Sequence, residues 1–166
     1  METKNKQKTD ECCPQFHQEK WDGKTFNWTN KHFIKTSVPT LFHIPFRKLL
    51  GKKITALMQK AEVSKKLEEN TEDVLMLFTD PHAFKSDIYL SVTDDVPNAK
   101  NKKISGTFMA KVFDGPYKAI PKFIKKMDTY LNKQNKKAKD YYVHYAYCPK
   151  CAEKFGHNYM VLFAKV

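Results

Sequence analysis

The sequence predicts an α+β fold in which two βαββ repeats form one antiparallel sheet, with two helices on one face and a ligand groove on the other. Two amphipathic helical stretches are each preceded by one strand-like segment and followed by two. The two halves also align at one constant offset, which places Thr36 on Thr107, Phe42 on Phe113 and Pro45 on Pro116. Recurrence of the element order in register is the sequence signature of a duplication.

The first half reads as strand, helix, strand, strand. Residues 33–42 read as an extended strand, with Pro39 at an edge or bulge. Residues 47–66 show apolar side chains at spacings of three and four, which predicts a helix. The strands expected after it cover residues 74–78 and 88–92.

The second half repeats this order. Residues 104–114 are expected to form a strand and residues 118–131 a helix. The two closing strands are expected at residues 141–147 and 159–164, and residues 93–103 read as the loop that joins the halves.

We therefore expect a single domain over residues 33–166, with repeat one at about 33–96 and repeat two at about 104–166. Residues 1–32 are expected to form an N-terminal extension that carries a cysteine pair and an aromatic strap.

Composition limits the function classes. The 166 residues are 41% hydrophobic, enough for one buried core, and no signal-peptide or membrane-spanning pattern is present, so we expect a cytoplasmic protein without a membrane partner. The net charge is +12, but Arg47 is the single arginine and the lysines are spread over the whole chain. Base readout relies on the guanidinium fork, so a nucleic-acid partner is not expected. We expect a monomer or weak dimer.

The strand-to-helix turn Gly115-Pro116-Tyr117, inside a duplicated module, resembles the GyrI-like small-molecule-binding family, whose fold also forms the effector domains of multidrug-sensing regulators. The resemblance covers residues 33–166. It implies a groove for lipophilic, often cationic, compounds. The family often carries a buried glutamate near the start of the final strand, where this chain has His157 and Asn158; Asp87 could substitute.

Strand alternation assigns side chains to the groove, with Asp87 and Tyr89 on one strand and Met160 on the last. The expected ligand-binding residues are Tyr89, Asp87, Tyr117, Tyr145, Tyr147, Met160 and Trp28. Aromatic faces suit flat apolar ligands and attract cations. In the alternative interpretation the N-terminal segment covers this face, and Trp21 or Trp28 fills the groove.

The four cysteines fall into two pairs, Cys12-Cys13 and Cys148/Cys151, the second pair in a CxxC spacing. Tetrahedral zinc needs four ligands from such clusters, so we expect a structural zinc site, which His157 or His17 could complete. A redox pair at a helix N-terminus and free thiols remain open, whereas disulfides are disfavoured in the cytoplasm.

No nucleophile elbow or phosphate-binding glycine loop is present, and no organic cofactor is expected. The sequence therefore predicts a protein that binds or sequesters lipophilic, possibly cationic, compounds. The alternative is a hydrolase that acts on a lipophilic toxin in the same groove. Its candidate catalytic residues are Tyr117, Tyr145 and Asp87, with Tyr89 and Asp114 as further candidates. Asp114 is expected to cap the following helix, and His43 and His144 to be structural.

Overall fold

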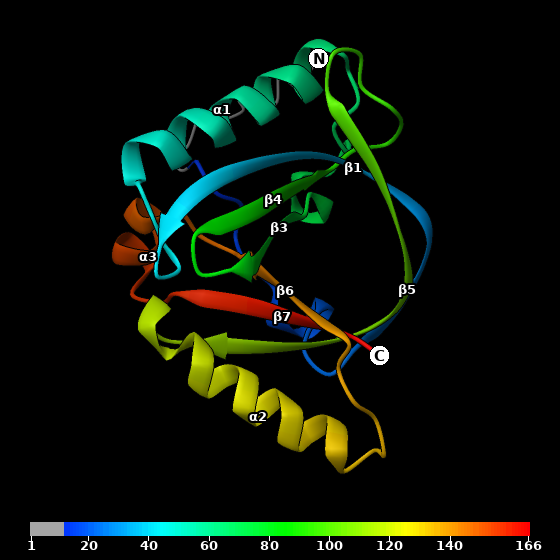
Figure 1. The fold of residues 1–166 in the computed structure, drawn as a ribbon, viewed down its shortest axis with the longest axis vertical. Helices are drawn as coiled ribbons and strands as arrows, with labels where there is room; N and C mark the ends of the chain where they lie inside the picture. Colours follow the sequence, from blue (N-terminus) through cyan, green and yellow to red (C-terminus); the bar gives the residue numbers. More distant parts are fainter. Residues whose placement is uncertain (1–11) are drawn as a thin grey trace, which may run out of the picture.

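The computed structural model describes residues 12–166, and its six long strands close into a barrel (Figure 1). The strands follow the order β1-β4-β3-β6-β7-β5, and β5 pairs back onto β1, with every pairing antiparallel. Their bounds are β1 Thr25–Leu41, β3 Met76–His82, β4 Lys85–Ser91, β5 Lys100–Asp114, β6 Asp140–Tyr145 and β7 Tyr159–Lys165. The two-residue strand β2 (Ile44–Pro45) extends the edge of β1.

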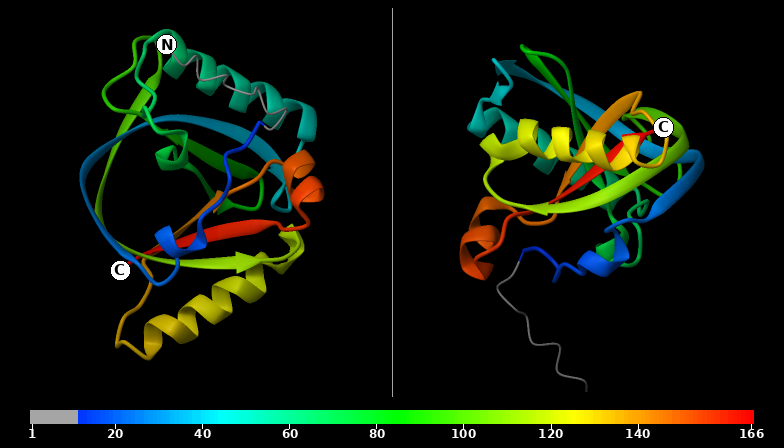
Figure 2. Two further views of the ribbon diagram at one scale, coloured as in Figure 1. Left: turned by 180° about the vertical axis from the view of Figure 1, so that it is seen from behind. Right: turned by 90° about the horizontal axis from the view of Figure 1, so that it is seen from below.

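Three α-helices of the described residues lie outside the barrel: α1 (Arg47–Val63), α2 (Ile120–Asn132) and the short α3 (Pro149–Phe155). α1 and α2 lie on opposite sides of the strands, and α3 connects β6 to β7 (Figures 1 and 2). Single turns of 3-10 helix occur at η1 (Gln18–Lys20), η2 (Thr71–Asp73) and η3 (Tyr117–Ala119). Within residues 12–166, no helix has the length and apolar character needed to cross a membrane.

The expected α+β class with an antiparallel sheet is confirmed. The elements run β1-α1-β3-β4 and then β5-α2-β6-β7, and both expected long helices are present within a few residues of their predicted bounds. The prediction that the halves are two repeats of one duplicated unit stays a prediction.

The expected sheet with a groove on its free face is wrong, because β1 begins eight residues before the predicted strand over 33–42. Its 17 residues pair with two of the other long strands: Thr25 to Lys35 align with β5 and Phe33 to Pro39 with β4. This overlap joins the two edges of the sheet. The expected domain boundary at residue 33 therefore falls inside β1, and residues 25–32 form part of the barrel. Residues 1–11 of the expected extension lie outside the described residues.

The inner face of the barrel is packed with aromatic side chains. Phe33, Phe108 and Phe163 are fully buried there, and Trp21 enters from the segment before β1. The Trp28 ring lies 4.3 Å from that of Phe108, centroid to centroid. Both tryptophans thus occupy the face that was expected to hold ligand, as in the alternative interpretation.

Two further cores lie between the barrel and its long helices. Leu57 and Ala61 of α1 pack on Ile34, Ile88 and Leu90. Phe123 and Met127 of α2 pack on Met109, Met160 and Leu162. β4 and β7 therefore bury both of their faces, one inward and one beneath a helix, which accounts for their near-continuous apolar runs in the sequence.

Candidate functional site

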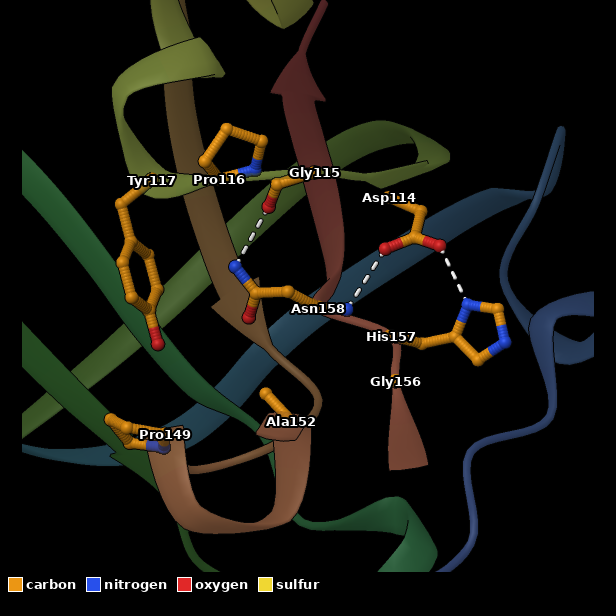
Figure 3. A pocket seen from close by; sticks show the side chains of 9 residues that line it. All are labelled: Asp114, Gly115, Pro116, Tyr117, Pro149, Ala152, Gly156, His157 and Asn158. Carbon is orange, nitrogen blue, oxygen red and sulfur yellow. Dashed lines mark hydrogen bonds and ion pairs between the residues drawn. The ribbon is translucent and has the colours of Figure 1, made fainter. Parts of the chain in front are cut away.

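A pocket of about 480 Å³ lies at the end of the barrel where β5 ends and β7 begins (Figure 3). One wall is the turn from β5 into η3, and the other is α3 with the residues that follow it. Its lining residues are Asp114, Gly115, Pro116, Tyr117, Pro149, Ala152, Gly156, His157 and Asn158. Apolar side chains, exposed backbone and a small polar group therefore meet in one place.

Asp114 and His157 form the polar group. The Asp114 Oδ2 atom lies 2.7 Å from His157 Nδ1, and Oδ1 accepts a hydrogen bond of 2.8 Å from the Asn158 backbone N–H. Burial alone would raise the pKa of Asp114, but these two hydrogen bonds lower it below its ordinary value. Because the ionised carboxylate can only accept, His157 Nδ1 carries the proton in this pair when the imidazole is neutral, and Nε2 is then a free base.

Packing also fixes the imidazole plane. The rings of His157 and Tyr159 are stacked, with centroids 4.9 Å apart and an interplanar angle of 11°. Tyr159 in turn contacts Phe16 at 5.1 Å. The ring of His157 is thus held from two directions, by the Asp114 carboxylate and by an aromatic face, although both His157 and Asp114 remain substantially open to solvent.

Asn158 presents an unused acceptor next to this pair. Its Nδ2 donates a 2.7 Å hydrogen bond to the Gly115 carbonyl oxygen, so the amide orientation is determined: the opposite flip would bring two acceptors together. Its Oδ1 is buried and has no hydrogen-bond partner among the described residues. In Figure 3 this oxygen points away from Gly115, toward the side of the pocket that Tyr117 and Ala152 border. A water or a ligand N–H or O–H group can satisfy it.

The structure brings two of the three predicted catalytic residues together. The rings of Tyr117 and Tyr145 are 5.4 Å apart in an edge-to-face arrangement, and Tyr145 also contacts Phe78 at 5.1 Å. Burial raises the pKa of both tyrosines, and the negative charge of Asp80 adds to the effect at Tyr145. Both hydroxyls are therefore neutral donors near neutral pH.

The third predicted residue, Asp87, lies in a different environment, on β4. It is paired with Lys35 at 2.8 Å and with Lys85 at 3.3 Å, and it accepts a 2.5 Å hydrogen bond from Ser37 Oγ. Burial would raise its pKa, but these partners lower it below the ordinary value. The expectation of a raised carboxyl pKa in an apolar groove is therefore wrong for Asp87, which is held ionised by its neighbours.

The remaining predicted ligand contacts are dispersed. Tyr89 is buried in the barrel interior, with the Lys35 ammonium 5.3 Å from its ring centroid. Met160 is fully buried beneath α2, so alternation from the first half placed it on the wrong face. Trp28 packs inside the barrel. Tyr147 is buried, and its hydroxyl accepts a 3.1 Å hydrogen bond from the Phe16 N–H.

The four predicted metal ligands converge behind α3. The sulfur atoms of Cys12, Cys13, Cys148 and Cys151 all lie within 4.8 Å of one another. Burial raises the pKa of Cys13. The pKa of Cys148 falls to about 7, because hydrogen bonds from the Cys151 N–H and from neighbouring thiols outweigh the effect of burial. His157 and His17, considered as further ligands, pair with Asp114 and with Glu19 instead.

The pairing of Asp114 with His157 was not predicted from the sequence. Asp114 was expected to cap the following helix and was a further catalytic candidate, and His157 was considered as a metal ligand. In the structure the Asp114 carboxylate instead bonds to His157 and Asn158. The available signal was strand pairing: Asp114 ends β5 and Tyr159 begins β7, and these two residues are partners in the ladder. Adjacent strand ends bring their flanking residues together.

A family model described as "Bacterial hydrolase" matches residues 3–166. Among solved structures, a hydrolase from Listeria innocua superposes with a TM-score of 0.59 at 12% identity, covering 86% of this chain and 90% of that chain. An uncharacterized conserved protein from Listeria innocua superposes with a TM-score of 0.60 at 11% identity, covering 85% and 90%. At these identities the two structures establish the shared fold alone. No curated protein matches the chain.

Proposed function

Because the chain belongs to the bacterial hydrolase family, we propose that it hydrolyses an apolar small molecule in the pocket between the β5–η3 turn and α3. The observation that carries the proposal is the hydrogen bond between Asp114 and His157 at the mouth of that pocket. Binding without turnover, the main expectation from the sequence, becomes the competing outcome of the test.

In the proposed reaction, His157 Nε2 acts as a general base. It removes a proton from a water molecule as the oxygen attacks the electrophilic carbon of the substrate. Asp114 holds the imidazole in the tautomer with Nδ1 protonated and stabilises the imidazolium that forms. The imidazolium then returns the proton to the leaving group. No covalent intermediate with the protein is required.

The other lining residues supply binding. Pro116, Pro149 and Ala152 give the pocket an apolar lining, which favours an apolar substrate. Asn158 Oδ1 is positioned to accept a hydrogen bond from the substrate or the attacking water. The Tyr117 hydroxyl, a neutral donor, is the candidate for a hydrogen bond to the leaving group or to a developing oxyanion.

The test uses p-nitrophenyl esters with acyl chains of two to eight carbons as probes, with reactions also run in 18O-labelled water. The expected result is release of p-nitrophenol and one labelled oxygen in the acid product. His157→Gln should lower kcat/KM by about 10²-fold or more, because general base catalysis contributes roughly 10²–10⁴-fold.

Glu19 and His17 supply a matched control, because they also form an acid–histidine contact but lie outside the pocket lining. His17→Gln should leave the rate unchanged. A rate that is the same in wild type and His157→Gln would overturn the assignment of the base. Saturable quenching of protein fluorescence by the esters with no turnover would indicate that the protein binds such compounds without hydrolysing them.

A further inference from the structure

The thiol groups of Cys12, Cys13, Cys148 and Cys151 have the spacing of a coordination shell. Cys12 Sγ lies 3.2 Å from Cys148 Sγ, 3.4 Å from Cys151 Sγ and 3.8 Å from Cys13 Sγ. Four sulfurs at the corners of a tetrahedron around zinc, with Zn–S bonds of about 2.3 Å, are about 3.8 Å apart. The cluster therefore has the dimensions of a site for one ion.

Backbone N–H groups orient two of these sulfur atoms. The Cys148 N–H donates a 3.2 Å hydrogen bond to Cys13 Sγ, and the Cys151 N–H donates to Cys148. Such N–H donors stabilise bound thiolates and orient them. The cluster joins positions up to 139 residues apart in the sequence, so its assembly depends on the complete fold.

We propose that these four cysteines bind one structural zinc ion. Four sulfur ligands complete a tetrahedral shell and leave no position for a substrate, which distinguishes a structural zinc site from a catalytic one. The clustering of all four thiols also argues against a CxxC redox pair. Such a pair uses two sulfur atoms and would leave Cys12 and Cys13 without a role.

The zinc ion would fasten one wall of the proposed active-site pocket. Cys148 precedes α3 and Cys151 lies within it, while Pro149 and Ala152 of the same helix line the pocket. On the other side, Cys12 and Cys13 lead to Phe16, which contacts Tyr159 beneath the His157 ring. Metal binding stabilises the folded state because a preformed site is absent from the unfolded chain.

The experiment measures the metal content of the full chain, purified under reducing conditions without chelator, by mass spectrometry of the elements. We expect about one equivalent of zinc per chain in wild type and less than about a fifth in Cys148→Ser and Cys151→Ser, because each removes one of four ligands. His17→Ala is the matched control and should retain the metal, since His17 contacts Glu19 rather than the cluster.

Cysteine variants that fail to fold would not distinguish a ligand from a core residue, so a second measurement uses the wild-type chain. Cobalt(II) should replace zinc and give the visible spectrum of a tetrahedral thiolate complex, and metal should protect all four thiols from a thiol reagent. Less than about a tenth of an equivalent of zinc, together with no thiolate-to-cobalt absorption, would overturn the proposal. So would a Cys148–Cys151 disulfide in the metal-free native protein.

These readouts are independent of the proposed hydrolysis. His157→Gln should keep its zinc even if it loses activity. Failure of the metal site would therefore leave the hydrolase proposal standing, and failure of hydrolysis would leave the metal site standing.

Discussion

Each carboxylate oxygen of Asp114 has a different hydrogen-bond partner. A substitution at Asp114 can therefore test the role of the contact with His157. Oδ1 accepts from the Asn158 backbone and Oδ2 faces His157 Nδ1. In Asp114→Asn the new amide N–H group can face His157 only if Nδ1 becomes the acceptor, which protonates Nε2 and removes the base. We expect kcat to fall by about 10²-fold or more while KM changes little. The measurement is steady-state kinetics on the esters.

Asp95 provides the control for this prediction. It forms a similar contact with His32, at 3.1 Å, away from the pocket lining. Asp95→Asn should keep wild-type kinetics. A loss of turnover in Asp95→Asn as large as that in Asp114→Asn would indicate a general effect of charge rather than the proposed role.

Asp87 is predicted to contribute to stability rather than to catalysis. Its folded-state pKa lies below the unfolded value of about 3.9, so its contribution is complete above that pH and is lost as the pH falls through the folded-state pKa. Asp87→Asn should lower the free energy of unfolding at pH 7 by about 3 kcal/mol, because Lys35 would lose its partner. The free energy of unfolding of wild type should decline below about pH 4, and in the variant this decline should be smaller.

Denaturant unfolding between pH 3 and pH 7 checks this prediction. The control is Asp73→Asn, which removes the partner of Lys20 in a pair that is half exposed. Exposed pairs contribute about 0 to 1 kcal/mol, so this variant should match wild type at every pH. Equal losses in the two variants would refute the special role of the buried pair.

At the scale of elements, α3 ends at Gly156, which has the left-handed value φ = 72° and lines the pocket. Apart from its two chain neighbours, no atom of residues 12–166 lies within 4 Å of the position that a Cβ would take there, so Gly156→Ala introduces backbone strain without a clash. The expected cost is about 1 kcal/mol of unfolding free energy. Thermal or denaturant unfolding is the measurement.

The same substitution at Gly51 should change the free energy of unfolding in the opposite direction. It lies inside α1 with a helical backbone, and beyond that helix backbone no atom of the part of the chain that the structure describes lies within 4 Å of its Cβ position. Gly51→Ala should stabilise the protein by about 0.5 to 1 kcal/mol, since alanine loses less backbone entropy in a helix. Changes of the same sign at the two glycines would contradict the assigned backbone conformations.

At the scale of the whole molecule, closure between β1 and β5 gives the barrel an interior that must be filled. Trp21 fills part of it, contacting Phe26 at 5.5 Å and Phe163 at 5.9 Å. Trp21→Ala should lower the unfolding free energy by about 3 to 5 kcal/mol through the cavity it leaves. Phe42→Ala is the control: that side chain is 70% exposed, so its loss should cost less than about 0.5 kcal/mol. Similar costs would refute the placement of Trp21.

The local periodicity of the chain was enough to predict its elements. Apolar spacing indicated α1 and α2, and the apolar runs indicated β3, β4, β6 and β7, because these signals depend on neighbours a few residues apart. The assignment of side chains to the two faces of each strand was less predictable in the second half of the chain. Met160 was assigned to the groove by an offset that is wrong by one residue at β7, and one residue exchanges the two faces of a strand.

The sequence by itself determined the α+β class, the order of the strands and long helices, and the candidate status of the four cysteines, because composition, periodicity and spacing are local properties. Only the tertiary structure decided that the sheet closes, that Trp21 and Trp28 occupy its interior, and that Asp114 lies against His157. Each of these depends on which strand ends meet. Pairing between distant strands is a property of the whole barrel, so no window of the sequence contains it.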